Sequence, residues 1–222
     1  MVLGQISAVI FDLDGTLINS LDGLVASVNA VLRRQGFPEH PKERIKTFIG
    51  NGLFALMQRA LPPETAEESI DSCCLEFKKV YAELGLVGCR PYAGVDNLLR
   101  HLQRSETPFA VLSNKPHEFT GQYVKKFFPE TCFSCIYGLR PGFRRKPHPD
   151  SALEIAEIMN CKPDLIAFVG DSEVDIQTGK NANMQTIAVS WGYQPLDRLE
   201  ANRPDYLIHQ PKDLLDYVFA AL

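Results

Sequence analysis

Apolar residues recur along the chain with two different periods, and the change of period divides the sequence. Between positions 20 and 86, apolar side chains return at helical spacing in three runs, within 21–32, 53–60 and 70–81. Gly or Pro follows each run, which predicts a block of three or four helices without a strand. Outside this block, short apolar runs alternate with helical patterns, as they do in βαβ units.

The apolar runs outside the block predict the strands of a parallel sheet. Those at 6–11 and 165–169 are almost entirely apolar, which is typical of strands buried on both faces. Shorter runs of the same kind lie at 108–112, 132–137, 186–189 and 206–208. We therefore expect an α/β fold with a doubly wound, Rossmann-like parallel sheet. Its core comprises residues 1–18 and 87–222, and an α-helical domain over 19–86 is inserted after the first strand.

Composition narrows the class of protein. The 222 residues are 45% apolar and 23% charged, as in an ordinary globular protein. A net charge of −4 argues against a nucleic-acid surface, which normally carries a basic excess. No stretch approaches the roughly 20 apolar residues of a membrane span. The N-terminal segment lacks the basic start and the cleavage site of a signal peptide. We expect a cytoplasmic protein.

The six cysteines do not suggest a disulfide framework in a chain of this length. Cys132 and Cys135 have the C-x-x-C spacing of redox and zinc sites, but a second pair and a nearby histidine are missing from the sequence. We expect them to be plain thiols.

Seven polar residues follow predicted strands, and in a parallel sheet such strand ends converge on one crevice. They are Asp12, Asp14, Ser113, Asn114, Lys146, Asp171 and Asp175. Each has an ordinary explanation when taken singly, as a turn, a helix cap or a surface lysine. Their joint occurrence, each in order after a strand, is harder to explain in that way. The sequence therefore predicts one polar site at the edge of the sheet.

Such a set of groups suits the transfer of a phosphoryl group. Carboxylates are the hard oxygen ligands that Mg²⁺ prefers, and a divalent cation would offset their mutual repulsion. Lys146 and the Ser113 hydroxyl match the charge on phosphoryl oxygens. One carboxylate of the Asp12–Asp14 pair can act as a nucleophile, and the other can exchange protons with the leaving oxygen and water.

The four segments that carry these residues resemble the motifs of the haloacid dehalogenase superfamily, across essentially the full chain. They are Phe11–Leu17, Leu112–Asn114, Lys146–Pro147 and Val169–Asp175. The resemblance implies that Asp12 is the nucleophile and Asp14 the general acid/base. It implies that Ser113, Lys146 and the backbone of Asn114 hold the phosphoryl group. It also implies Mg²⁺ bound by Asp12, the backbone carbonyl of Asp14 and Asp171, with Asp175 in support. The helical insertion would be the small cap of that superfamily.

Within the superfamily, the chain resembles the phosphoglycolate phosphatases. The segments Phe48–Leu53 and Ser113–Pro116 are similar to theirs, and Thr16 fits the phosphatase branch. Asp14 argues against a dehalogenase, which needs no acid/base at that position. The resemblance implies that 2-phosphoglycolate, or another small phosphorylated metabolite, is hydrolysed to the alcohol and phosphate by a monomer or homodimer. Arg44, Lys46 and the turn 50–52 are candidates for substrate contacts.

Three alternatives remain. A pyrophosphatase or a phosphosugar mutase of the same superfamily would use the same core. A receiver domain, which is a phospho-acceptor switch without a substrate, also gathers acids, a hydroxyl and a lysine at a sheet edge. Receivers place the acceptor after a middle strand, however, and they lack so large a helical insertion. A non-catalytic binding protein on this fold is the third.

Overall fold

The computed structural model describes residues 6–218, and its main sheet has six strands in the order β5-β4-β1-β6-β7-β8. Every pair of neighbouring strands in it is parallel. The strands are β1 (Ala8–Phe11), β4 (Phe109–Pro116), β5 (Ile136–Leu139), β6 (Ile166–Gly170), β7 (Gln185–Val189) and β8 (Tyr206–Ile208). This arrangement confirms the predicted doubly wound α/β fold.

The first strand lies in the middle of the sheet and determines where a site can form. Phe11, the last residue of β1, is in register with Val111 of β4 and Val169 of β6. The chain runs outward from β1 to β4 and β5, and then returns to β6 before it continues to β7 and β8. Such a reversal opens a crevice at the carboxyl ends of the strands beside β1.

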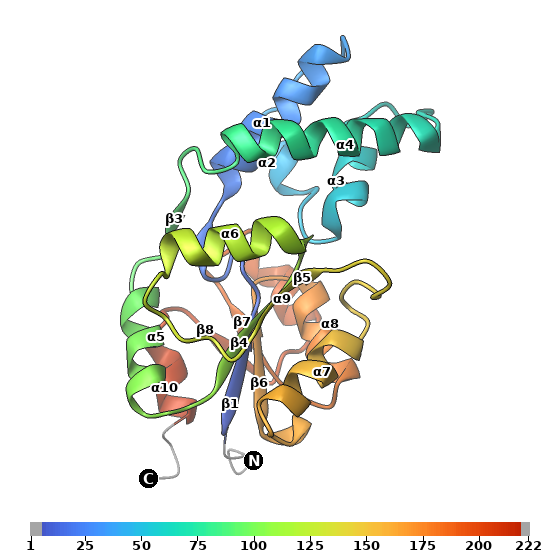
Figure 1. Cartoon of the computed structure of the whole chain (residues 1–222). Coiled ribbons are helices and arrows are strands. Elements are labelled where there is room, and N and C mark those ends of the chain that lie inside the picture. The colour runs from blue at the N-terminus through green and yellow to red at the C-terminus, as the bar shows by residue number, and fades with distance from the viewer. Residues whose placement is uncertain (1–5, 219–222) are drawn as a thin grey trace.

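Helices cover both faces of the sheet (Figure 1). They are α5 (Val95–Arg104), α6 (His117–Phe127), α7 (Asp150–Ile158), α8 (Glu173–Asn181), α9 (Leu196–Ala201) and α10 (Asp213–Val218), with a 3-10 turn at Pro163–Leu165. Val9 and Phe11 of β1 pack with residues of α5, α6 and α10, whereas Ala8 and Ile10 pack with residues of α7. The side chains of a strand alternate between its two faces, so β1 is buried on both sides.

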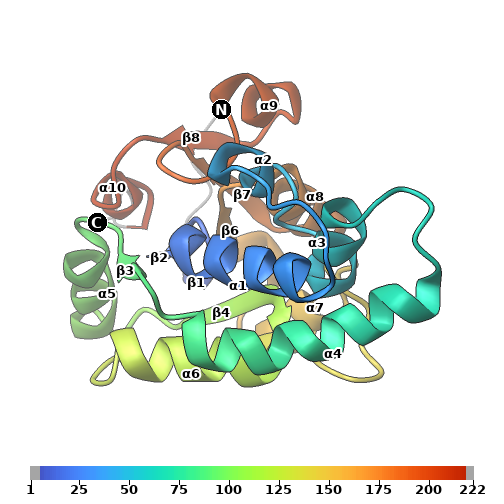
Figure 2. The same cartoon turned by 90° about the horizontal axis from the view of Figure 1, so that it is seen from above.

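Four further helices form a layer above the carboxyl ends of the strands, and we call it the helical layer (Figures 1 and 2). They are α1 (Leu21–Arg34), α2 (Lys42–Lys46), α3 (Gly52–Ala60) and α4 (Glu67–Leu84). Helices α1 and α3 both pack against α4. The chain enters and leaves the layer through an antiparallel pair, β2 (Ile18–Asn19) and β3 (Arg90–Pro91). Within residues 6–218, none of the helices has the length and apolar character needed to cross a bilayer.

One predicted strand is partly wrong. The apolar run 132–137 suggested a strand, but β5 begins only at Ile136. Phe133, which precedes β5, packs its ring against that of Phe109 in β4, with 5.0 Å between the ring centroids. Cys132 and Cys135 are free thiols.

Two helices of the helical layer meet where two glycines touch, which gives a stability prediction. A Cβ on Gly23 of α1 would lie 1.9 Å from the carbonyl oxygen of Gly85, the residue after α4. We expect Gly23→Ala to lower the free energy of unfolding by about 1–3 kcal/mol, because the backbone must shift. Urea denaturation of the purified protein would measure it.

Gly121→Ala is the matched control, because Gly121 lies within α6 and a Cβ there would have nothing within 4 Å. This change should raise the free energy of unfolding by up to about 1 kcal/mol through helix propensity. Equal stability of the two variants would contradict the packing described here.

Candidate active site

The strand ends converge as the topology requires. All seven polar residues predicted for the site line one cavity of about 700 Å³, including the part open to solvent. They are Asp12, Asp14, Ser113, Asn114, Lys146, Asp171 and Asp175. The sheet edge forms one side of this cavity and the helical layer the other, with lining residues from α1, α3 and α4.

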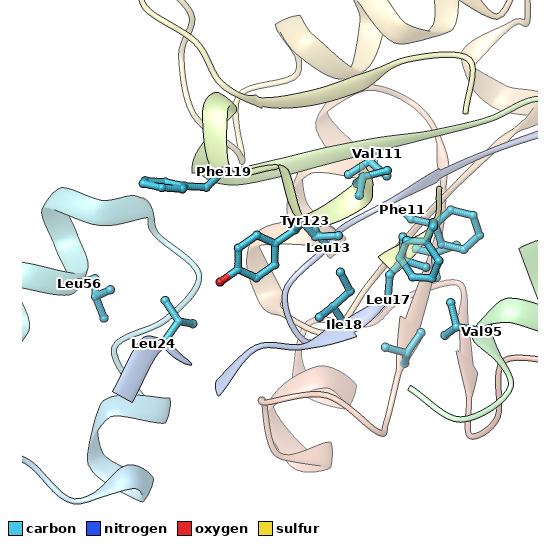
Figure 3. Packing of buried hydrophobic residues seen from close by; sticks show 14 of the residues in the cluster. Phe11, Leu13, Leu17, Ile18, Leu24, Leu56, Val95, Val111, Phe119 and Tyr123 are labelled. Carbon is cyan, nitrogen blue, oxygen red and sulfur yellow. The ribbon is translucent and has the colours of Figure 1, made fainter. Parts of the chain in front are cut away.

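Alternation after β1 directs the two acids to the same side. Leu13 is buried in the apolar cluster that also contains Tyr123 of α6 (Figure 3). Its neighbours Asp12 and Asp14 line the cavity instead. Gly15 then turns the chain with a φ of +90°, and a Cβ there would lie 2.3 Å from Asp171 Oδ2. A glycine is therefore required where the turn after β1 passes the carboxylate that follows β6.

Lys146 is a buried cation whose three protons are all engaged. Its Nζ donates to Asp12 Oδ1 at 2.8 Å, Asp175 Oδ1 at 2.7 Å and the carbonyl oxygen of Leu112 at 2.9 Å. Burial acts to lower the pKa of Lys146, but the charges of Asp12 and Asp175 outweigh it and raise that pKa above its usual value. The ammonium therefore stays charged and fixes Asp12 in place.

Three carboxylates share this buried region. One oxygen from each of Asp12, Asp171 and Asp175 lies within 4.8 Å of the others. Burial raises the pKa of Asp12 to about 6, and Lys146 only partly opposes the shift. Burial, with the charges of Asp175 and Asp12, also raises the pKa of Asp171. A bound divalent cation would remove this repulsion, and the all-oxygen donor set fits a hard cation.

The three carboxylates are not equivalent. Asp175 accepts from Lys146 through Oδ1 and from the backbone and hydroxyl of Ser172 through Oδ2, where Ser172 caps α8. Both of its oxygens are thus bonded to protein groups. Asp171 accepts from the backbone N–H of Tyr193 at 2.7 Å, and Thr16 Oγ1 is 3.3 Å from its other oxygen. The two carboxylates still differ, because Asp175 is bonded to an ammonium and twice to Ser172, whereas Asp171 has, in the described part of the chain, no ammonium bonded to it and only a 3.3 Å contact on one oxygen.

Asp14 belongs to a separate network. The hydroxyl of Ser20 donates to its Oδ1 at 2.5 Å, and Lys115 Nζ lies 3.0 Å from each of its oxygens. Lys115 Nζ also donates to the hydroxyl of Tyr81 in α4 at 2.6 Å. The Ser20 hydroxyl therefore serves Asp14, although its place before α1 is that of a helix cap.

Asn114 connects the helical layer to Lys146 through its side chain. Its Nδ2 donates to the carbonyl oxygens of Gly50 at 2.9 Å and Lys146 at 3.0 Å, and its Oδ1 accepts from the backbone N–H of Lys146 at 2.8 Å. The sequence pointed only to the backbone of this residue. The adjacent Ser113 lines the cavity, as expected.

Sequence reasoning assigned no role to Lys115 or Tyr81. Lys115 stands in the polar segment that follows the second predicted strand, directly after Ser113 and Asn114, whereas Tyr81 looked like one more apolar residue of a helix face. Arg44 and Lys46, proposed for substrate contact, are not among the residues that line the cavity.

Comparison with known proteins finds similar sequences among the haloacid dehalogenase-like hydrolases. A family model described as haloacid dehalogenase-like hydrolase matches residues 9–189. The phosphoglycolate phosphatase of Escherichia coli (strain K12) is 33% identical to the chain, with 95% of this chain and 92% of that protein covered. The phosphoglycolate phosphatase of Aquifex aeolicus (strain VF5) is 30% identical, with 93% and 94% covered.

A solved structure extends the comparison to three dimensions. The crystal structure of a predicted phosphoglycolate phosphatase from Haemophilus somnus 129pt superposes with a TM-score of 0.89 at 29% identity. The match covers 96% of this chain and 97% of that one.

The crowded carboxylates give a prediction for metal binding. With its pKa raised from 3.8 to about 6, Asp12 is largely protonated in the fold at pH 5 and ionised at pH 7.5. Protonated Asp12 contributes to the stability of the metal-free protein, and this contribution is lost as the pH rises through about 6. Mg²⁺, used as the probe cation, should therefore raise the melting temperature more at pH 7.5 than at pH 5.

Differential scanning calorimetry with and without Mg²⁺ at the two pH values measures this effect. Asp12→Asn should remove most of the difference, whereas Asp197→Asn, on an exposed helix, should keep it. A Mg²⁺ effect of equal size at both pH values would contradict binding at these carboxylates.

Proposed function

The chain belongs to the haloacid dehalogenase-like hydrolases, and from that premise we propose that it is a Mg²⁺-dependent phosphatase that acts through an aspartyl-phosphate on Asp12. The relatives named above make it a phosphoric monoester hydrolase. The observation that carries the mechanism is the separation of Asp12 and Asp14 into two networks. Asp12 contacts Lys146 beside the other carboxylates, while Asp14 contacts a hydroxyl and a second lysine.

In the first step, a carboxylate oxygen of Asp12 attacks the phosphorus of the substrate. The bond between phosphorus and the ester oxygen breaks, and the leaving oxygen takes a proton from Asp14, so that an alcohol departs. In the second step, a water attacks the phosphorus of the aspartyl-phosphate and gives its proton to Asp14. The bond between phosphorus and Asp12 breaks, and inorganic phosphate and the free carboxylate are formed.

The surrounding residues stabilise the charge of the transferring group. Lys146, held on Asp12 at 2.8 Å, faces its negative oxygens, and the Ser113 hydroxyl supplies a further donor. Mg²⁺ would be held by Asp12, by the backbone carbonyl of Asp14 and by Asp171. Asp175, which is itself held by Lys146 and Ser172, would support these ligands without binding the ion. The metal ion supplies Lewis-acid polarisation of the phosphoryl oxygens and neutralises the carboxylates.

We assign the helical layer the role of a cap that closes over the substrate and excludes water. The core would then comprise residues 1–18 and 87–222, and the cap residues 19–86. The hydrogen bond from Asn114 to Gly50 joins the turn before α3 to the loop that carries Lys146. Asn114 is thus a positioning residue that links closure to the placement of Lys146.

The best substrate candidate is 2-phosphoglycolate, which would yield glycolate and phosphate. Support comes from the names of the relatives, which share a third of their residues with this chain over most of its length. A panel that includes pyrophosphate and glucose 1-phosphate would reveal a pyrophosphatase or a mutase instead.

Replacement of the nucleophile tests the proposal. Asp12→Asn should reduce phosphate release from p-nitrophenyl phosphate by at least about 10⁴-fold, because the covalent step is lost. Phosphate release with Mg²⁺ would be measured beside Asp197→Asn, which should match the wild type. Unchanged turnover in Asp12→Asn, or no turnover of any phosphomonoester by the wild type, would sink the proposal.

The Asn114 contacts give a second test. Asn114→Ala removes two hydrogen bonds to the backbone of Lys146 and one to that of Gly50, and a small misplacement of a catalytic group can cost about 100-fold in rate. We expect kcat to fall by roughly 10- to 100-fold, with Asn202→Ala, which loses one local bond, as the control. A kcat equal to that of the wild type would show that the side chain does not position Lys146.

A further inference from the structure

The helical layer presents an almost uncharged wall to the cavity. Its side chains there are Leu24, Ile49, Leu53, Leu56, Phe77 and Tyr81, beside the glycines of the turn before α3. Among these described lining residues, the Tyr81 hydroxyl is the one polar side-chain group. A charged leaving group bound against this wall would therefore need its counter-charge from the sheet side of the cavity.

Two cations line the cavity within residues 6–218, Lys115 and Lys146. Lys146 is committed to the phosphoryl end, because it donates to three separate core groups beside Asp12, whereas two of the three hydrogen bonds of Lys115 go to the single carboxylate of Asp14. Lys115 is the cation that remains for the leaving group. Its side chain is only 4% exposed, so the ammonium has exchanged water for a few defined contacts.

Those contacts hold Lys115 in place from the apolar side. Its Nζ lies 4.0 Å from the ring centroid of Tyr123 and 4.7 Å from that of Tyr81, so both aromatic rings stabilise the charge. The same Nζ donates to the Tyr81 hydroxyl, whose own proton is directed to the hydroxyl of Tyr123. Burial, together with the charge of Asp14, raises the pKa of Tyr81, so the phenol keeps its proton.

The remaining contact of Lys115 places it beside the reacting bond. Its Nζ is 3.0 Å from each oxygen of Asp14, the residue that gives a proton to the ester oxygen in the proposed reaction. The ester oxygen must then lie about 2.6–3.2 Å from Asp14. Lys115 and the ester oxygen are thus separated by at most two hydrogen-bond lengths, roughly 6 Å. A carboxylate attached to the carbon of the ester comes within reach of the ammonium.

We propose that Lys115 and the Tyr81 hydroxyl form a receptor for a carboxylate next to the ester oxygen, so that the enzyme selects phosphate esters of 2-hydroxycarboxylates. This inference rests on the proposed function and names the group that reads the substrate. The carboxylate accepts one hydrogen bond from Lys115, in place of one now made to Asp14, and a second from the Tyr81 hydroxyl, in place of the one now made to Tyr123. The apolar wall then contacts only the carbon atoms of the leaving group.

The test compares three substrates that share the phosphoryl group. They are 2-phosphoglycolate, ethyl phosphate, which has a similar poor leaving group without the carboxylate, and p-nitrophenyl phosphate, which has a good leaving group. The full-length wild type should prefer 2-phosphoglycolate over ethyl phosphate by at least about 100-fold in kcat/KM, since an unpaired buried cation discriminates strongly.

Variants then separate a receptor from a residue that acts only through Asp14. Lys115→Met should lower kcat/KM for all three substrates, because Lys115 also holds Asp14, but the loss for 2-phosphoglycolate should exceed the other two losses by at least about 20-fold. Tyr81→Phe should lower kcat/KM for 2-phosphoglycolate by about 10-fold more than for the other two substrates, through the loss of one hydrogen bond to a charged group. Tyr217→Phe, on a helix at the far end of the sheet, is the matched control and should behave as the wild type.

Equal losses for all three substrates in Lys115→Met would overturn the inference, because Lys115 would then act only by holding Asp14. A wild type that hydrolyses ethyl phosphate as well as 2-phosphoglycolate would overturn it without any variant, even if Lys115→Met fails to fold. In both cases, Asp12-dependent hydrolysis of p-nitrophenyl phosphate would leave the proposed function standing. Loss of that activity in the wild type would instead reject the proposed function itself.

Discussion

The structure depends on the burial of three like charges around a single cation. Asp12, Asp171 and Asp175 lie together at the end of the central strands, and Lys146 is the ammonium bonded among them. Repulsion and desolvation raise the pKa values of Asp12 and Asp171, so the free protein holds its site at a cost in stability. A bound divalent cation would remove that cost, and in the proposed reaction Lys146 and the cation would together neutralise the negative charge of the phosphoryl group.

Different hydrogen-bond partners make the two neighbouring acids, Asp12 and Asp14, chemically different. Asp12 lies among carboxylates and a lysine whose protons are all engaged, which suits a nucleophile held still. Asp14 lies against a hydroxyl and Lys115, and through Lys115 it is connected to Tyr81 of the helical layer. In the proposed reaction, Asp14 therefore contacts the part of the cavity where the leaving group would depart. One strand end can supply both proposed roles because alternate residues face opposite sides, so that Asp12 and Asp14 face the cavity while Leu13 is buried between them.

The fold and the positions of the acids could be predicted because both follow from local pattern and chain order. Asp12, Asp171 and Lys146 each come after a strand, and the parallel topology brings those points together whatever the loops do. Tyr81 and the side-chain role of Asn114 could not be predicted. They depend on how the helical layer seats on the sheet, and Tyr81 carries the same apolar spacing as its packing neighbours. The strand predicted from position 132 was wrong in its start, because the apolar Phe133 packs its ring against Phe109 and does not pair in the sheet.

The identity of the covalently modified residue tests the account most directly. The wild type would be mixed with 2-phosphoglycolate or p-nitrophenyl phosphate and Mg²⁺, quenched in acid within a turnover, reduced with borohydride and digested for mass spectrometry. An acyl-phosphate on a carboxylate is reduced to an alcohol, so the account predicts homoserine at position 12 and intact aspartate at position 14. Homoserine at position 14, or rapid phosphate release with aspartate unchanged at both positions, would contradict it.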